Sequence, residues 1–359
     1  MMSYRTNSMQ TQTSNKKKAV ALISGGLDSM LAARLVLDQG VYVEGINFFT
    51  GFCVEGHTQA IRKKDRTRAK RNNALWVAEQ LGIRLHIVDI VEEYKRVLRA
   101  PRHGFGANLN PCLDCKIFMV RRAVEWMQAH SFDFIVTGEV IGQRPMSQRK
   151  ATMPLVANES EAGELLVRPL SAKNLAETLP EQLGWLDRSL LKDFSGRNRK
   201  PQIALAKQYG FHDYAQPAGG CCFLTDPNYV RKLQDLWTIR SAIDYELDDI
   251  ILLKVGRHIR PNSRFKLIVA REASEVAFLR GYRKQYPCLL TTTHPGPLAL
   301  LIGEPDLDDV ELAGRIVARY SQGRDEQRVG VAYRAPDRDE TSFEVLPLQP
   351  SEIPHSWIL

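Results

Sequence analysis

Long apolar runs are missing from this sequence of 359 residues. A membrane-spanning helix needs about 20 consecutive apolar residues, so we expect no membrane segment. The first 17 residues are polar and lack the apolar core of a secretory signal. We interpret residues 1–17 as a flexible leader and expect a cytoplasmic protein.

Cysteine is also scarce, with six in the whole chain. This is too few for a disulfide scaffold in a protein of this size, and without an export signal the thiols are expected to be reduced. Any clustering among them would then indicate metal or redox chemistry. The sequence has no second CxxC and no HxxxH pattern, so it does not complete a structural zinc site.

Charge of both signs is present, and the balance is basic. Lys plus Arg number 49 and Asp plus Glu number 41, which gives a formal net charge of +8. Seven basic residues and one aspartate lie between Arg62 and Arg71. Such a block is either a solvated face or a contact for a polyanion, because each neutralised phosphate releases counterions.

Strand-like and helix-like segments alternate over the first part of the chain. The strand-like segments are 18–24, 42–49, 85–90 and 132–137, and the helix-like segments are 30–39, 69–81 and 113–129. Strands separated by helices need crossover connections, which predicts a doubly wound parallel α/β sheet. Ligands of such sheets bind beyond the carboxyl ends of the strands, so we expect functional residues just after Ser24, Phe49, Asp89 and Thr137.

The character of the sequence changes after Gly210. Residues 217–227 are rich in turn formers, a helix is predicted over 229–239, and segments 250–260 and 265–270 are typical of paired strands around a turn at Pro261. We therefore predict a first domain over 18–210, a second, smaller α+β domain over 211–335 and a C-terminal extension over 336–359.

The segment Ser24–Ser29, SGGLDS, lies between the first predicted strand and the first helix. Its two glycines let the backbone turn sharply and approach an anion. Backbone amides and serine hydroxyls at a helix N-terminus then donate to phosphate oxygens. No lysine follows the glycines as in the Walker loop, so the segment predicts a site that holds pyrophosphate. The alternative is a tight turn with Ser29 as a helix cap.

This segment resembles the SGGxDS signature of the PP-loop ATP pyrophosphatase superfamily, whose adenine nucleotide alpha hydrolase-like fold is also doubly wound. Members of the superfamily adenylate an oxygen, release pyrophosphate and let a nucleophile displace AMP. The resemblance implies that Ser24, Gly25, Gly26 and Ser29 hold the pyrophosphate part of ATP. It also implies that Asp28 is a catalytic residue that works near the phosphates through Mg²⁺.

A second motif follows the fourth predicted strand. Residues 137–148, TGEVIGQRPMSQ, resemble the TGExxGQxxSQ segment of tRNA 4-thiouridine synthetases. The resemblance places Gly138, Glu139, Gln143 and Gln148 at the ATP site. From its position, Arg144 is expected to neutralise phosphate charge. The alternative is an ordinary turn with scattered polar residues.

Cys112 and Cys115 form a CxxC pair at the start of a long predicted helix. A helix N-terminus lowers a thiol pKa, so we expect thiolates there; the alternatives are idle thiols or half of a zinc site. Cys221, in the glycine-bounded turn PAGGC, is a third candidate. Cys222 is less favoured because neighbouring side chains diverge in extended backbone. Three thiolates suit a 4Fe-4S cluster with one iron that lacks a protein ligand.

This pattern is similar to that of cluster-dependent tRNA thiolation enzymes, in which three cysteines hold such a cluster. The segments NPCLDCKIFM, TGEVIGQRPMSQ, VRPLSAK and PAGGC match bacterial proteins that join a 4-thiouridine-synthetase-type domain to a small RNA-binding-like domain. The resemblance implies that Cys112, Cys115 and Cys221 are the cluster ligands. A competing arrangement uses Cys112 and Cys221 as catalytic residues, one carrying a persulfide and the other resolving it. Cys53 and Cys288 match no motif and are interpreted as bystanders.

An RNA-capture domain precedes the nucleotide-binding domain of 4-thiouridine synthetases, whereas 17 residues precede the first predicted strand here. The predicted C-terminal hairpin resembles the small RNA-binding domain of ribosome-quality-control factors. We predict that the basic residues around this hairpin contact RNA; the alternative is a charged edge strand. They are Lys254, Arg257, His258, Arg260, Arg264 and Lys266. The block 62–71 and the run Arg197, Arg199 and Lys200 are secondary candidates.

Together these motifs predict an ATP-dependent tRNA sulfurtransferase that adenylates a carbonyl oxygen of a uridine or cytidine and replaces it with sulfur. The implied partners are tRNA and a sulfur donor, either sulfide or a persulfide derived from a cysteine desulfurase. One alternative is another adenylating enzyme of the same fold, such as an amidotransferase or small-molecule ligase. The other is a non-catalytic protein that binds RNA or carries a cluster. The modified base, the sulfur donor, the oligomeric state, the choice between a cluster and a persulfide, and whether Cys221 or Cys222 is the ligand do not follow from the sequence.

Overall fold

The computed structural model of the chain describes residues 16–54, 72–214 and 221–359. These residues form two compact units that interleave along the chain. The first unit contains the chain up to residue 47 together with 73–88 and 116–216, and the second contains 48–72, 89–115 and 217–359. The linear boundaries at 210 and 335 expected from the sequence stay predictions.

The first unit is built on a five-stranded sheet in the order β3-β2-β1-β4-β5. Its strands are β1 (Lys18–Leu22), β2 (Tyr42–Phe49), β3 (Leu85–Asp89), β4 (Phe134–Val136) and β5 (Leu166–Val167). Strand β1 pairs in parallel with both β2 and β4, and β4 pairs in parallel with β5. Strand β2 follows on one side of β1, whereas β4 is added on its other side. The strand order therefore reverses between β1 and β4, and folds of this kind bind ligands at such a switch point. The predicted doubly wound sheet is confirmed.

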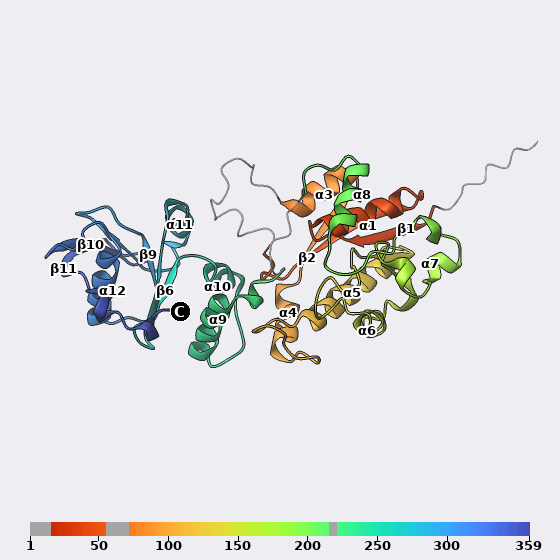
Figure 1. The fold of residues 1–359 in the computed structure, drawn as a ribbon. Coiled ribbons are helices and arrows are strands. Elements are labelled where there is room, and N and C mark those ends of the chain that lie inside the picture. The colour runs from red at the N-terminus through yellow and green to blue at the C-terminus, as the bar shows by residue number, and fades with distance from the viewer. Residues whose placement is uncertain (1–15, 55–71, 215–220) are drawn as a thin grey trace, which may run out of the picture. The chain divides into compact units, whose positions relative to one another are not determined.

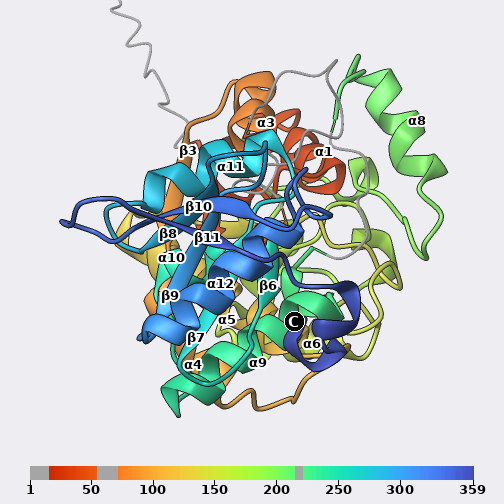
Figure 2. The same cartoon turned by 90° about the vertical axis from the view of Figure 1, so that its left-hand side faces the viewer.

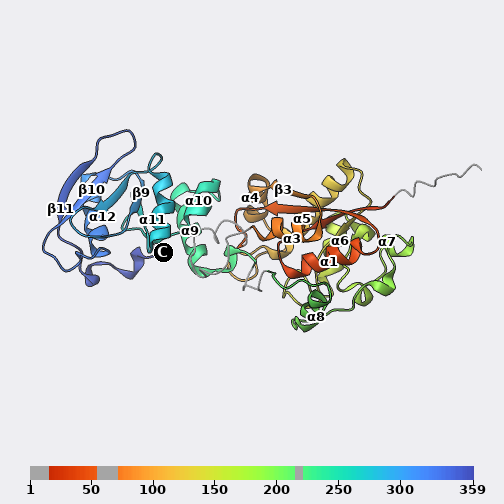
Figure 3. The same ribbon diagram turned by 90° about the horizontal axis from the view of Figure 1, so that it is seen from above.

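Helices cover both faces of this sheet. The helices of the first unit are α1 (Leu27–Leu37), α3 (Asn73–Leu81), α5 (Cys112–Ala129), α6 (Thr152–Glu159), α7 (Leu179–Gln182) and α8 (Lys200–Gln208), although α5 begins in residues of the second unit. Helix α1 packs against α3 and α8 on one side of the strands, while α5 and α6 lie on the other side (Figures 1 and 3). Helix α1 is apolar on nearly all sides and almost wholly buried, which fixes the loop before it.

The second unit contains a six-stranded sheet in the order β11-β10-β8-β9-β7-β6. The strands are β6 (Arg257–Ile259), β7 (Phe265–Val269), β8 (Cys288–Thr291), β9 (Ala299–Gly303), β10 (Val329–Arg334) and β11 (Thr341–Val345), and the pairs are antiparallel. Helix α12 (Leu307–Arg319) covers one face, as Figure 2 shows. Segments around α10 (Leu247–Leu252) and α11 (Ala273–Leu279) pack against the other face. The predicted second α+β domain is therefore confirmed as a fold class.

Two further helices complete the second unit. Helix α4 (Val91–Arg99) follows β3, and helix α9 (Pro227–Arg240) follows the PAGGC segment. Asp226 caps α9, because its carboxylate accepts hydrogen bonds from the amides of Asn228 and Tyr229. Within the described parts of the chain, no helix is long and apolar enough to cross a membrane.

One predicted strand is wrong over half of its length. Residues 247–252 form helix α10, and the strand begins only at Arg257. Glu246 and Asp249 form a capping box that starts the helix, and Ile250 to Leu252 are buried. A short apolar run fits a buried helix turn as well as a buried strand, and here the cap decides.

Candidate nucleotide and thiol sites

The SGGLDS segment forms a tight loop between the end of β1 and the start of α1. Gly25 has a φ of +81°, a conformation that favours glycine, and a Cβ there would lie 2.8 Å from Asn73 Cβ. Ser29 Oγ donates to the carbonyl oxygen of Gly26 at 2.8 Å, and the Ser24 and Ser29 hydroxyls lie 3.3 Å apart. The loop therefore combines a sharp turn, a helix N-terminus and two hydroxyls, which suits a bound phosphate.

The second motif packs directly on this loop. A Cβ at Gly138 would lie 2.5 Å from the backbone carbon of Asp28 and 2.5 Å from the amide nitrogen of Ser29. No side chain fits at that distance, so the end of β4 and the phosphate loop touch through backbone atoms. The two predicted motifs thus belong to one constellation at the switch point of the sheet.

Asp28 is held in place by side chains from two other elements. Gln143 Nε2 donates to Asp28 Oδ2 at 2.6 Å, and Arg199 Nη2 lies 3.4 Å from Asp28 Oδ1. Gln202, which is fully buried, donates to Gln143 Oε1 at 3.2 Å. Arg199 precedes α8 and Gln202 lies within it, and neither was predicted for this site. From the sequence, Arg199 is a secondary candidate for RNA contact. The structure instead places it in an ion pair with Asp28, at the phosphate loop.

Glu139 is buried, and its carboxylate forms ion pairs with internal cations. Its Oε2 accepts hydrogen bonds from Arg168 Nε at 3.1 Å and from Thr137 Oγ1 at 2.9 Å, and Lys116 Nζ lies 3.9 Å from Oε1. Burial alone would raise the pKa of Glu139, but the charges of Lys116 and Arg168 and the hydrogen bonds to the carboxylate outweigh it and lower the pKa. Arg168 belongs to the VRPLSAK segment, so this motif supplies the side chain that holds the Glu139 carboxylate.

Two buried amide oxygens near this constellation are unsatisfied. Within the described residues, Gln148 Oε1 and Gln202 Oε1 have no hydrogen-bond partner. Buried polar atoms are rarely left so, and a missing ligand is a common reason. Arg144 is half-buried in the same segment. Arg144 and the amides of the loop can donate to phosphate oxygens, whereas the two glutamine oxygens are acceptors and suit a donor group of a bound ligand.

All six cysteines belong to the second unit, and five of them come close together there. Cys115 lies within electrostatic range of Cys112, Cys221 and Cys53, and Cys222 lies within range of Cys53, Cys221 and Cys115. The three stretches that supply them are the segment after β2, the start of α5 and the segment before α9. Cys53, expected to be a bystander, belongs to this group. Cys288 is buried in β8, within the core of the second sheet.

The protonation of Cys115 differs from the sequence-based expectation of a thiolate. Burial raises the pKa of the Cys115 thiol, and the neighbouring thiols raise it further, although the Tyr94 hydroxyl donates to the sulfur and opposes the shift. Burial likewise raises the pKa of Cys222. Desolvation therefore outweighs the helix N-terminus at Cys115.

The donor chemistry of this thiol group suits iron and sulfur, but its spacing is not that of a closed metal site. Cys112, Cys115 and Cys221 supply three sulfur donors of the kind that hold Fe–S clusters. Within the residues that the structure describes, no three His, Cys, Asp or Glu side chains are spaced to hold a metal ion. The donors are thus present in one region without forming a metal-binding geometry.

Lys254 adds a positive charge to the thiol group. Its Nζ donates to the carbonyl oxygen of Gly51 at 2.5 Å and lies 4.9 Å from the centre of the Phe223 ring. Burial lowers the pKa of Lys254 to about 8, while nearby Cys53 and Cys222 oppose the shift. Lys254 was expected at an RNA surface, yet only 6% of it is exposed.

Most of the predicted basic RNA surface is likewise internal or paired. His258 is 0% and Lys266 3% exposed. Arg260 donates to Asp235, and Arg264 donates to Asp309. Of the six residues, Arg257 and Arg264 are exposed, and Arg257 lies 5.0 Å from the centre of the Tyr320 ring. The expectation of a basic hairpin surface is therefore wrong for most of its members, and the block 62–71 lies outside the described residues.

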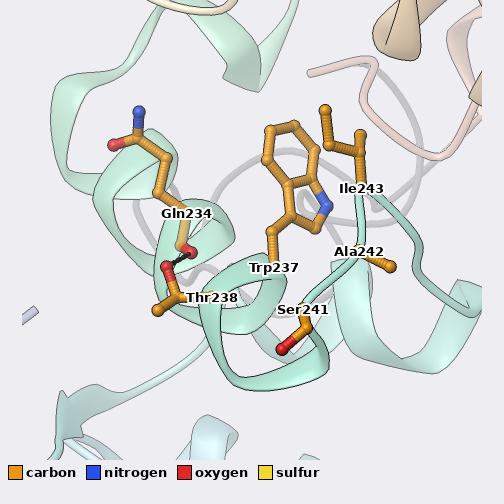
Figure 4. Close-up of a pocket in the computed structure, with 6 residues that line it drawn as sticks. All are labelled: Gln234, Trp237, Thr238, Ser241, Ala242 and Ile243. Carbon is orange, nitrogen blue, oxygen red and sulfur yellow. Dashed lines mark hydrogen bonds between the residues drawn. The ribbon is translucent and has the colours of Figure 1, made fainter.

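A separate hollow lies on helix α9 of the second unit. It is lined by Gln234, Trp237, Thr238, Ser241, Ala242 and Ile243 (Figure 4). Thr238 Oγ1 is occupied by a hydrogen bond to the carbonyl oxygen of Gln234 at 2.9 Å. This lining is made of apolar, amide and hydroxyl side chains.

Comparison with protein families separates two parts of the chain. Residues 17–179 match the family described as "tRNA methyl transferase HUP domain". Residues 256–358 match the family described as "NFACT protein RNA binding domain". The first match contains SGGLDS, the CxxC pair and residues 137–148, and the second contains the antiparallel sheet.

Curated relatives are tRNA-specific 2-thiouridylases. The enzyme of Marinobacter nauticus is 25% identical over 238 residues, which cover 64% of this chain and 56% of the relative. That of Mesoplasma florum is 29% identical over 266 residues, which cover 68% of this chain and 65% of the relative. The chain thus spans somewhat more than half the length of these relatives.

Among solved structures, a 4-thiouridine synthetase–RNA complex with bound ATP is similar at 21% identity and a TM-score of 0.39, covering 66% of this chain and 52% of that one. The C-terminal part of a fibronectin/fibrinogen-binding protein from Streptococcus suis is similar at 13% identity and a TM-score of 0.26. That match covers 45% of this chain and 79% of that one.

Proposed function

We propose that this chain, whose nucleotide-binding part belongs to the PP-loop superfamily of tRNA-thiolating enzymes, is an ATP-dependent tRNA sulfurtransferase. The main observation behind the proposal is the set of contacts that hold the Asp28 carboxylate. The motif loop, Gln143 and Arg199 all converge on this carboxylate at the switch point of the sheet. A site of that composition suits a nucleoside triphosphate whose pyrophosphate is to leave.

The chain's residues would divide the work of adenylation. The amides and hydroxyls of Ser24–Ser29 would bind the pyrophosphate part of ATP, and Asp28 would hold Mg²⁺, which would supply charge to offset that of the phosphates. Arg199 and Gln143 fix the Asp28 carboxylate, and the Arg199 guanidinium adds positive charge. The carbonyl oxygen of the target base attacks the α-phosphate, and pyrophosphate leaves. The base oxygen then carries AMP, which is a good leaving group.

The thiol group would supply the second half of the reaction. A sulfur nucleophile attacks the activated ring carbon, AMP leaves, and a carbon–sulfur double bond replaces the carbon–oxygen one. A 4Fe-4S cluster, when bound, would be held by Cys112, Cys115 and Cys221 and would supply an iron with an open coordination position. Lys254 places a positive charge beside the thiols, which favours the approach of an anionic sulfur species.

We further propose that the second unit binds the tRNA. Its match to an RNA-binding family supports this role. Since the predicted hairpin cluster is largely internal, exposed basic residues elsewhere in the second unit would make the contact. Lys284, Arg280 and Arg334 are exposed, and Arg334 pairs in register with Cys288 at one end of β10.

Mass spectrometry of tRNA nucleosides tests the proposal. A strain without this gene should lack one thiolated nucleoside, and the wild-type gene should restore it. Asp28→Asn and Cys112→Ser should fail to restore it, while the matched control Cys288→Ala, in the second sheet, should succeed. An unchanged nucleoside profile in the deletion strain would refute the proposed substrate and leave another adenylating reaction.

A further inference from the structure

A second hollow, of about 600 Å³, lies at the amino ends of the strands of the first unit. Lys18 begins β1 and Tyr42 begins β2, and the two residues are partners in the parallel register. Arg84 and His86 flank the first residue of β3, and Phe132 lies shortly before β4. All five line the hollow. The SGGLDS loop follows the opposite, carboxyl end of β1, a strand about 13 Å long, so the hollow is distinct from the nucleotide site.

Glu44 supplies a buried carboxylate to this hollow. It lies on the same face of β2 as Tyr42, because alternate residues of a strand point the same way. The Tyr42 hydroxyl donates to Glu44 Oε1 at 2.5 Å, and His86 Nε2 lies 2.6 Å from Oε2. Burial alone would raise the pKa of Glu44, but these two hydrogen bonds outweigh it and lower the pKa. The carboxylate is thus fixed and charged, and each oxygen retains a lone pair for a further donor.

Cations outnumber this carboxylate in the lining of the hollow. Lys16, Lys18 and Arg84 belong to the lining and are exposed. Arg84 Nη1 lies 4.0 Å from Glu44 Oε1, and 72% of the Arg84 side chain is exposed, so it can also contact a second anion. Lys18 Nζ lies 5.9 Å from the centre of the Phe132 ring. Three permanent cations beside one carboxylate favour a ligand that carries negative charge.

Aromatic rings also line the hollow. The ring centres of Tyr42 and Phe132 lie 6.2 Å apart, and Tyr42 is 42% exposed. Trp126 of α5 supports them, because its ring lies 5.0 Å from that of Phe132 and stacks at 4.1 Å on the ring of His130, which is exposed. Packing alone explains these rings but not the buried carboxylate beside them, because burying a charge costs free energy. Exposed rings next to cations are the combination that binds the bases and phosphates of single-stranded nucleic acids.

We propose that this hollow binds one ribonucleotide. Its phosphate lies against Lys16, Lys18 and Arg84. Its base stacks on the Tyr42 ring, and its 2′-hydroxyl donates to the Glu44 carboxylate. The 2′-hydroxyl distinguishes RNA from DNA, and a carboxylate is a common acceptor for it. The ribonucleotide is either free or part of an RNA chain; only its assignment to tRNA rests on the proposed function.

Photocrosslinking of the full chain locates the ligand. A tetraribonucleotide of 5-bromouridine is bound and irradiated, and the crosslinks are mapped by peptide mass spectrometry. We expect crosslinks to Tyr42 or to residues 130–132, and crosslinks found only outside these positions would overturn the inference. Asp28→Asn should thiolate no tRNA yet give the same crosslinks, which separates this inference from the proposed function.

Competition by uridine 5′-monophosphate distinguishes the two sources of the ribonucleotide. Loss of the Tyr42 crosslink when the monophosphate equals the oligonucleotide in concentration would assign the site to free nucleotides. Loss only at large excess, or no loss, would assign it to a nucleotide within an RNA chain. Either result supports a ribonucleotide site, because the crosslink itself places the ligand.

Removal of two cations tests the phosphate contact. Binding is measured from the yield of the Tyr42 crosslink at several salt concentrations. Lys16→Ala/Lys18→Ala should reduce the slope of log K against log salt by about 1.4, since each contact to a single strand contributes about 0.7. The matched control Lys173→Ala/Lys207→Ala changes two exposed lysines of the same unit and should keep the wild-type slope. Equal slopes for the wild type and Lys16→Ala/Lys18→Ala would contradict the inference.

Replacement of Glu44 tests the recognition of ribose. The wild type should bind the ribonucleotide probe about tenfold more tightly than the matching 5-bromodeoxyuridine probe, the effect of one hydrogen bond to a charged group. Glu44→Leu removes the acceptor and should bind both probes equally, with its fold checked by circular dichroism. Equal binding of the two probes by the wild type would overturn the inference without recourse to any variant. A folded Glu44→Leu chain that keeps the preference for RNA would overturn it as well.

Discussion

Backbone contact between Gly138 and the Asp28–Ser29 peptide makes the nucleotide site sensitive to a single methyl group. A Cβ at Gly138 would lie 2.5 Å from backbone atoms that cannot rotate away. We therefore expect Gly138→Ala to displace the loop and to weaken ATP binding at least tenfold, equivalent to about 1.4 kcal/mol. Isothermal titration calorimetry with ATP and Mg²⁺ measures this directly.

A matched control for Gly138→Ala exists in the second unit. A Cβ at Gly281 meets nothing within 4 Å and needs no positive φ, so Gly281→Ala should bind ATP as the wild type does. Equal ATP affinity for the wild type and Gly138→Ala would contradict the described contact between the two motifs.

His258 makes stability depend on pH. It is fully buried, its Nε2 faces the carbonyl oxygens of Leu252 and Val255 at 3.2 and 3.0 Å, and burial with nearby Lys232 and Lys266 lowers its pKa well below the usual value. The unfolded chain gains a proton below about pH 6.5 that the folded chain does not. The free energy of unfolding should therefore fall by up to about 1.4 kcal/mol per pH unit as the pH drops below that value.

Urea unfolding of the full chain at pH 7.5 and 5.5 measures this effect. His258→Gln keeps a donor for the carbonyl oxygens and removes the titration, so its stability should change less between the two pH values. His355→Gln, at an exposed position, should retain the wild-type dependence. An identical pH dependence for His258→Gln and the wild type would show that His258 is not the group responsible.

The sequence motifs identified the site residues that follow a strand end directly. They did not identify the site residues that are distant from those motifs in the sequence. Ser24 to Ser29 and Gln143 follow β1 and β4, where parallel sheets bind ligands. Arg199 reaches Asp28 across 171 residues, and Gln202 then fixes Gln143. An arginine before a helix has no spacing signal that distinguishes it from a solvated cation, so only the folded chain reveals it.

At the scale of elements, the sequence predicted the bounds of long apolar or amphipathic segments best. Strand β2 has the bounds 42–49 expected from the sequence, and α5 begins one residue earlier than expected. Helix α4 was not assigned, although Val91, Tyr94 and Leu98 form a buried face at helical spacing. Strand β5 has two residues, too few for any periodic signal.

The ends of strand β10 provide a prediction about tRNA binding. Arg334 lies at one end opposite Cys288, and Lys284 is an exposed cation close by in sequence to β8. Lys284→Glu/Arg334→Glu should weaken tRNA binding and reduce the slope of log K against log salt by about two, since each contact contributes roughly one. Fluorescence anisotropy at several salt concentrations measures both quantities.

The control for this pair changes charge equally in the same unit. Arg324 and Arg328 precede the other end of β10 and are 59% and 80% exposed, so their double replacement by Glu should leave the salt slope unchanged. If both double variants bind tRNA with the same affinity, the contact is not at the Arg334 end of the strand.

At the scale of the whole molecule, the two units interleave along the sequence. The thiol group depends on this interleaving, because Cys53, the CxxC pair and the Cys221–Cys222 pair come from three separate stretches of the second unit. Motif spacing identified three of these cysteines, while the antiparallel bridge between Cys53 and Cys222 follows from backbone hydrogen bonds that sequence patterns do not encode.

The central claim is that one chain couples adenylation of a tRNA base to its thiolation. The full chain, reconstituted anaerobically with iron and sulfide, is incubated with ATP, Mg²⁺ and unmodified tRNA, and pyrophosphate and thiolated nucleosides are counted. The account predicts one thiolated nucleoside for each pyrophosphate released, and neither product from Asp28→Asn. Pyrophosphate release without any thiolated nucleoside, or thiolation without ATP, would contradict it.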